Sequence, residues 1–178
     1  MALAGATRTK LADALLADGP TREHAEALML FGQFVGEWEL DWSGYDEDGA
    51  QARTEHGEWI FGWVLEGRAV QDVWIIPARG RRASQQGEYG TTIRIYDPQL
   101  DIWLVTWSGS INGARRTLIA RRDGDAIVQE GSTETGLPLR WIFSAIAEDS
   151  FTWRSFSSND GERMWQLRES MHVRRKPG

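Results

Sequence analysis

Polar side chains that could carry chemistry stand among tryptophans in this 178-residue chain. A carboxylate packed against indole rings loses hydration, so its pKa rises and it can serve as a general acid or base. An arginine or tyrosine in the same setting can polarise a carbonyl group. An unpaired charge inside a protein costs on the order of several kcal/mol, so any that faces inward should bind another side chain or a ligand. The polar residues that lie within aromatic-rich predicted strands are Glu58, Asp72, Arg94, Tyr96, Arg140, Arg154, Arg168 and Glu169.

An enzyme built from these groups would use Glu58 or Asp72 with Tyr96 or His172 as acid and base, without a cofactor. It would act as a cyclase or isomerase on an apolar substrate. His172 and His56 are expected one strand apart if the first and last strands of a barrel meet. The third histidine, His24, belongs to a helical segment and is expected on the surface.

The tryptophans suggest a different function, the binding of a small molecule. Six of the ten form W-x-x-x-W pairs, and the pair Trp38/Trp42 encloses a strict alternation of apolar and acidic residues that is typical of a strand. An indole buries about 200 Å² and carries one N–H that needs a partner, so an indole-lined wall suits an apolar or aromatic ligand with polar spots. The alternative is that these rings are ordinary core residues. The predicted ligand-binding residues are Trp59, Trp63, Tyr96, Trp107, Trp141, Trp153 and Arg154.

Several other chemistries are disfavoured by the sequence. The chain has no cysteine and no H-x-H or H-x-x-x-H spacing, which argues against a tetrahedral zinc site. It also lacks a phosphate-binding glycine loop, a dinucleotide fingerprint and a G-x-S-x-G nucleophile turn. We therefore expect neither a metal nor another cofactor.

The charge balance limits the partners. A net charge of −6 and a pI near 5.1 argue against nucleic acids and anionic membranes. The N-terminus lacks the pattern of a signal peptide and no window is long and apolar enough for a membrane span, so a cytoplasmic location is the expectation. The sequence leaves open a homodimer, and also a barrel filled by its own side chains that contacts a protein partner through N-terminal helices.

Two regions position these residues, a helical segment over 1–31 and a barrel over 32–178. The helical segment predicts two short helices, the second capped by Thr21 and ending near Gly32. The fold class is all-β, an antiparallel up-and-down barrel of about ten strands, because short turns such as Asp48-Gly49 force neighbouring strands to be antiparallel. Which of Gln71 and Asp72 points inward stays open. The predicted strands are 36–43, 54–65, 68–77, 88–97, 101–109, 114–122, 125–132, 138–147, 150–157 and 162–174.

A G-x-W motif at Gly36 and Trp38 opens the first strand, Tyr96-Asp97-Pro98 is followed by Trp103, and the last strand is rich in arginine. In these features the chain resembles the lipocalin-like, or calycin, β-barrel superfamily, and more narrowly an uncharacterised bacterial branch with a G-x-W first strand and a Y-D-P-x4-W motif. The resemblance implies that Trp38 closes the base of the barrel and that Arg168 or Arg174 stacks over it. Because the superfamily includes transport proteins, haem binders and enzymes, it does not imply one activity.

Overall fold

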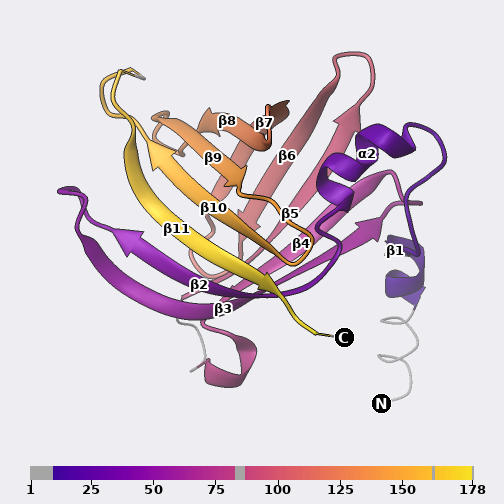
Figure 1. Cartoon of the computed structure of the whole chain (residues 1–178), viewed down its shortest axis with the longest axis horizontal. Coiled ribbons are helices and arrows are strands. Elements are labelled where there is room, and N and C mark those ends of the chain that lie inside the picture. The colour runs from indigo at the N-terminus through magenta and orange to yellow at the C-terminus, as the bar shows by residue number, and fades with distance from the viewer. Residues whose placement is uncertain (1–9, 83–86, 162, 178) are drawn as a thin grey trace.

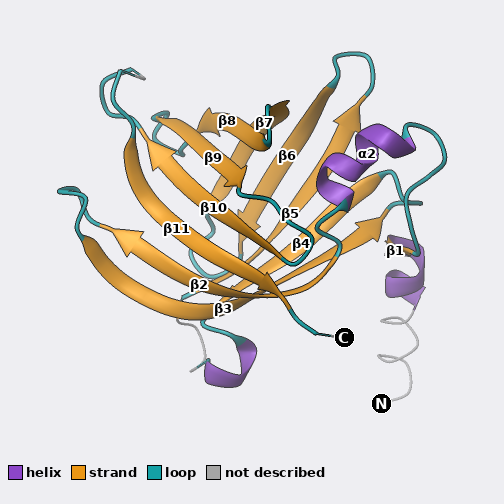
Figure 2. Ribbon diagram, in the orientation of Figure 1, coloured by secondary structure: helices purple, strands orange, loops and turns teal. Residues whose placement is uncertain are grey.

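A computed structural model describes residues 10–82, 87–161 and 163–177 of the chain. Ten antiparallel strands form a closed barrel, with short helical segments at the N-terminal side (Figure 1, Figure 2). The predicted fold class is therefore confirmed. The barrel strands are β2 (Gly36–Tyr45), β3 (Gln51–Val64), β4 (Ala69–Ile76), β5 (Glu88–Asp97), β6 (Ile102–Gly109), β7 (Arg115–Asp123), β8 (Ala126–Ser132), β9 (Pro138–Ser144), β10 (Ser150–Ser157) and β11 (Gln166–Arg175).

The barrel closes because the first and last of these strands pair with each other. Trp38 of β2 lies opposite Arg175 of β11, and on its other side β2 pairs with β3, which also pairs with β4. Every barrel strand thus has two hydrogen-bonded neighbours, and no long edge is left for association with another chain. A two-residue strand, β1 (Leu16–Ala17), pairs with the end of β3 and is not one of the ten barrel strands.

Tight turns produce the up-and-down order. The glycines of three Asp-Gly dipeptides, Gly49, Gly124 and Gly161, have positive φ angles of 79°, 58° and 73°. Glycine adopts this region without the steric cost that a Cβ atom would bring. Successive strands therefore reverse direction within a few residues, and alternate hairpins lie at opposite ends of the barrel.

Helix α2 (Ala25–Gly32) covers one end of the barrel (Figure 1). It ends near Gly32 as predicted, but the N-cap is His24 in a left-handed conformation, and the Thr21 backbone N–H instead donates to the Gly67 carbonyl. Gly32 lies directly against Trp63, whose ring would be only 2.3 Å from a Cβ atom at this position. Residues 10–15 are also helical. No helix within the described part of the chain has the length and apolar character needed to cross a membrane.

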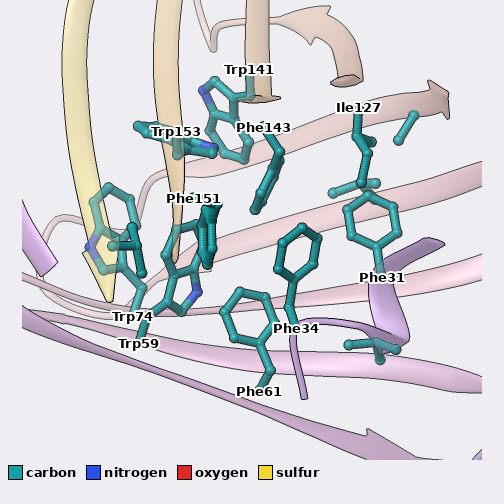
Figure 3. Packing of buried hydrophobic residues seen from close by; sticks show 14 of the residues in the cluster. Phe31, Phe34, Trp59, Phe61, Trp74, Ile127, Trp141, Phe143, Phe151 and Trp153 are labelled. Carbon is teal, nitrogen blue, oxygen red and sulfur yellow. The ribbon is translucent and has the colours of Figure 1, made fainter. Parts of the chain in front are cut away.

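Aromatic rings fill the barrel at the α2 end (Figure 3). Phe34 follows α2 and its ring centroid lies 5.0 Å from that of Phe143 and 4.8 Å from that of Phe151. Phe31 of α2 contacts Phe143 as well, at 5.9 Å. Both Phe31 and Phe34 are almost completely buried. Aromatic side chains therefore occupy this half of the interior.

Trp38 closes the same end, and its stacking partner differs from the one expected. The Arg175 guanidinium lies 4.0 Å from the Trp38 ring centroid, so neither Arg168 nor Arg174 takes that role. Arg175 also donates to the carbonyls of Gln33 and Val35 at 3.0 and 2.9 Å. Only the residue opposite Trp38 in the strand register can combine both contacts, and the exact register could not be predicted from the sequence.

Candidate functional site

A cavity of about 460 Å³ opens at the end of the barrel opposite α2. It lies between the hairpins β2–β3, β6–β7, β8–β9 and β10–β11. Its wall combines indole rings with charged and hydroxyl groups, whereas the interior near α2 is packed with phenylalanine rings. The residues that line it include Trp42, Trp74, Glu88, Trp107, Arg116, Trp141, Arg168 and Glu169.

Indoles from four strands form the apolar wall. The ring centroids of Trp74 and Trp107 are 6.1 Å apart, and those of Trp107 and Trp141 are 6.4 Å apart. Trp107 lies over the paired glycines Gly90 and Gly109, where an added Cβ atom would come within 2.8 Å of the ring. The two glycines therefore let this indole lie flat against the strands, which keeps the space above it open.

Two indoles of the wall have N–H groups without a partner in the described part of the chain. Within the described residues, the indole nitrogens of Trp74 and Trp107 are buried and have no hydrogen-bond partner. Both side chains are more than nine-tenths buried. A buried polar group without a partner costs about 1–3 kcal/mol, so native proteins keep few of them unless water or a ligand completes the site.

A β-bulge brings two charged residues to the cavity. In the pairing of β10 with β11, Ser155 lies opposite Glu169 while the next residue, Phe156, lies opposite Leu167. Arg168 is the extra residue of the bulge, so Arg168 and Glu169 both line the cavity although they are adjacent in sequence. Regular alternation would send one of them outward.

Burial raises the pKa of Glu169 to about 7, and the nearby Glu88 carboxylate adds to the rise. Arg116 and the indole of Trp42 oppose it, although Trp42 Nε1 does not reach hydrogen-bonding geometry. Burial also raises the pKa of Glu88, which sits at the start of β5. The cavity thus holds two carboxyl groups whose charged forms are disfavoured, and one of them changes charge near neutral pH.

The arginines nearby are engaged with other groups. Arg116 forms an ion pair with Glu134 at the rim, and burial lowers its pKa. Arg168 donates to the Ser157 hydroxyl at 2.8 Å and also to Gln166. Across the described parts of the chain, no ion pair within 4.0 Å joins an arginine to Glu88 or Glu169. Both carboxyl groups therefore remain available to a ligand.

The structure separates the predicted ligand-binding residues into three groups. Trp107 and Trp141 line the cavity, and Trp153 lies beneath them with its ring centroid 5.5 Å from that of Trp141. Trp59 is deeper still, 6.3 Å from Trp153. Trp63 lies at the α2 end against Gly32, Tyr96 is also at that end, and Arg154 is exposed on the outer face of β10.

The four candidate catalytic residues do not meet. Glu58 lies outside the barrel, where bonds from Arg79 lower its pKa, the opposite of what a base near neutral pH requires. Asp72 faces the interior, buried in an ion pair with Arg94. The Tyr96 hydroxyl donates to Asp101 at 2.8 Å.

His172 is exposed on the outer wall. It lies opposite Asp41, which lies opposite His56 on the next strand, so the two histidines are indeed one strand apart. The Asp41 carboxylate contacts His56 at 2.5 Å and Arg174 at 2.6 Å. This arrangement is an exposed charge network outside the barrel, separate from the cavity.

Sequence reasoning did not select several cavity residues, namely Trp42, Trp74, Glu88, Arg116 and Glu169. Glu169 was among the polar residues embedded in aromatic strands, and the rule that a carboxylate against indoles has a raised pKa describes it better than Glu58 or Asp72. The signal for Trp74 was hidden because β4 carries apolar residues on both faces. Glu88 begins a strand, where alternation gives no direction.

Within the described residues, no group of three or more histidine, aspartate or glutamate side chains could hold a metal ion. No family model matches the chain, and no curated protein matches it. One solved structure, described as "Structure of EF1p2_mFAP2b bound to DFHBI", is 13% identical, covers 81% of this chain and 94% of its own, and superposes with a TM-score of 0.36. A likeness at this level supports no statement about the family or ligand of this chain.

Proposed function

We propose that this protein binds a small apolar or aromatic molecule in the indole-lined cavity at the open end of its barrel. The observation that carries the proposal is the wall of indole rings, from Trp74, Trp107 and Trp141, that borders a cavity of about 460 Å³. A cavity of this size falls in the usual range for small-molecule sites, about 300–1,000 Å³.

The asymmetry of the barrel supports this assignment. At the α2 end, Phe31 and Phe34 complete the packing, and the Trp38 indole donates to the Phe34 carbonyl at 2.7 Å. At the open end, no equivalent segment covers the indoles in the described structure. A ring-shaped ligand would bury these apolar faces, and a polar group on it would pair with the polar side chains of the same wall.

The direct test is titration with a bicyclic alcohol, 2-tetralol, followed by tryptophan fluorescence and calorimetry. Trp107→Leu should weaken binding about tenfold or more because it removes a wall of the cavity. The matched control is Trp165→Leu, since Trp165 stacks with Arg140 on the outer surface, with the guanidinium 4.2 Å from the ring centroid. If neither 2-tetralol nor any other aromatic compound of a broad panel binds, and native mass spectrometry shows no retained molecule, the proposal is wrong.

A second candidate function, proton transfer on the bound molecule, is favoured by one observation. Glu169 lines the indole-walled cavity, and burial raises its pKa to about 7, which suits a general base near neutral pH. The probe is 5-nitrobenzisoxazole, which opens to a nitrile and a phenolate when a base removes its C3 proton. Turnover that rises with pH through about 7 and disappears in Glu169→Gln would support the enzyme. Turnover equal to that of the solvent would exclude Glu169 as a base for such chemistry.

A further inference from the structure

We propose that the ligand of this cavity is an organic ammonium ion, an aromatic or alicyclic amine whose charged nitrogen lies between Glu88 and Glu169. This inference rests on the proposed function and names the chemical class that the same site selects. It is carried by the geometry of two carboxyl groups within an indole wall.

Glu88 presents an oxygen with no use inside the protein. Its Oε1 accepts a hydrogen bond from the Asn112 side chain at 3.3 Å, whereas its Oε2 is buried and has no partner within the described residues. A carboxylate has about four acceptor sites, and one that is buried without donors pays the full cost of lost hydration. A donor brought by the ligand would remove that cost.

Glu169 reaches the cavity from a different wall. Glu88 comes from β5 and Glu169 from the bulge of β11, and three strands, β2, β3 and β4, separate β11 from β5 on the shorter way around the barrel. Both side chains nevertheless line the same cavity, and the charge of Glu88 adds to the rise in the pKa of Glu169. Like charges in a partly dry cavity repel, and a single cation between them would stabilise both.

Of the positive groups near the pair, Arg116 lowers the pKa of both carboxyl groups, but within the described residues no arginine forms an ion pair with either carboxylate inside 4.0 Å. Arg116 on β7 is paired with Glu134, and Arg168 on β11 donates to Ser157 and Gln166. Arg82 lowers the pKa of Glu88, but its guanidinium donates to the backbone carbonyls of Ile76 and Glu88. Arg53 also lines the cavity, with its guanidinium 5.9 Å from the Trp42 ring centroid, and it pairs with Glu55. Each guanidinium therefore has its own acceptor, and the carboxylates lack a contacting cation within the described residues.

The indole faces favour the same ligand class. A cation over a tryptophan face gains about 0.5–2 kcal/mol, more than over the other aromatic rings. Trp42 flanks Glu169, and Trp74 and Trp107 lie on the wall from which Glu88 extends. An amine attached to a hydrocarbon ring can therefore place its N–H donors on the carboxylates and its ring on the indoles in one orientation.

The experiment compares three ligands of one shape: 2-aminotetralin as the cation, 2-tetralol as the neutral analogue and tetralin-2-carboxylate as the anion. At pH 8 we expect the amine to bind at least about tenfold more tightly than the alcohol, and the carboxylate to bind most weakly. Amine affinity should rise between pH 6 and 8 as Glu169 loses its proton, while alcohol affinity stays level.

Variants distinguish the ammonium assignment from the broader proposal that the cavity binds a small apolar or aromatic molecule. Glu169→Gln and Glu88→Gln should each lower amine affinity about tenfold and change alcohol affinity by less than about twofold, with Glu47→Gln on the exposed β2–β3 turn as the control. Equal binding of amine and alcohol by the wild-type protein would overturn the ammonium assignment and leave the proposed function standing. If none of the three ligands binds, the ammonium assignment fails, and the proposed function then depends on the broad aromatic panel. Thermal melting of each variant checks that the fold is intact.

Discussion

The charge of Glu169 should destabilise the folded protein, and its removal should therefore raise the free energy of unfolding. Burial and the Glu88 charge raise the pKa of Glu169 from an ordinary 4.5 to about 7. Each pKa unit corresponds to about 1.4 kcal/mol, so the limiting effect is about 3 kcal/mol when the carboxylate is fully charged. Because the cavity opens to solvent, we expect about 1–3 kcal/mol at pH 8.

The pH dependence gives this prediction its sign. Between pH 4.5 and 7 the folded protein holds the Glu169 proton more tightly than the unfolded chain, so wild-type stability falls as pH rises through this window and levels above it. Glu169→Gln resembles the protonated form. The variant should be more stable than wild type at pH 8 and nearly equal to it at pH 4.

Urea unfolding at both pH values, followed by circular dichroism, measures the difference. Glu47→Gln is the control and should change stability little at either pH, since Glu47 is exposed. A Glu169→Gln variant that is less stable than wild type at pH 8, or whose stability gain is the same at pH 4, would refute the conclusion that burial and Glu88 disfavour the charged carboxylate.

Three further predictions concern the framework of the barrel. Phe34→Ala should lower the unfolding free energy by about 3–5 kcal/mol in chemical denaturation, because the Phe34 ring is buried among five aromatic neighbours. Asp72→Asn should cost about 3–5 kcal/mol by leaving Arg94 charged and unpaired, whereas the double change Asp72→Leu with Arg94→Met should recover most of that loss, as a double-mutant cycle would show. Arg175→Ala should cost about 2–4 kcal/mol and Arg175→Lys only partly less, since a lysine cannot reproduce the forked contacts; equal stability of wild type and both variants would contradict this role.

The barrel was predictable because its signals are local. Alternation of apolar and polar residues defines each strand, and Asp-Gly dipeptides at positions such as Gly49 and Gly124 mark the reversals. Which face of β4 points into the barrel was not predictable, since both Gln71 and Asp72 have apolar neighbours. Asp72 faces inward because Arg94, 22 residues away, supplies a buried partner for its charge. Such a pairing depends on strand register, which no short sequence pattern encodes.

The residue types of the site were predictable from the sequence, but the particular residues that line the cavity were not. Tryptophans line a cavity and a carboxylate among them has a raised pKa, as the residue types indicate. The bulge at Arg168 changes which residues of β11 face inward, and because most residues beside it are polar, the shift does not show in the hydrophobic pattern. Trp63 and Tyr96 lie at the opposite end of the barrel, which Phe31 and Phe34 fill. Long-range packing therefore decided which aromatic residues remain open.

The pairing of β2 with β11 also sets the order in which the protein can form during synthesis. One edge of β2, with the main-chain groups of Trp38 and Trp42 along it, has no partner until residue 175 has left the ribosome. Contacts this distant in sequence form slowly, and an unpaired apolar edge is prone to associate with other chains while it waits. Until the ten-residue strand β11 pairs with β2, the sheet cannot close, so this last pairing removes the exposed edge.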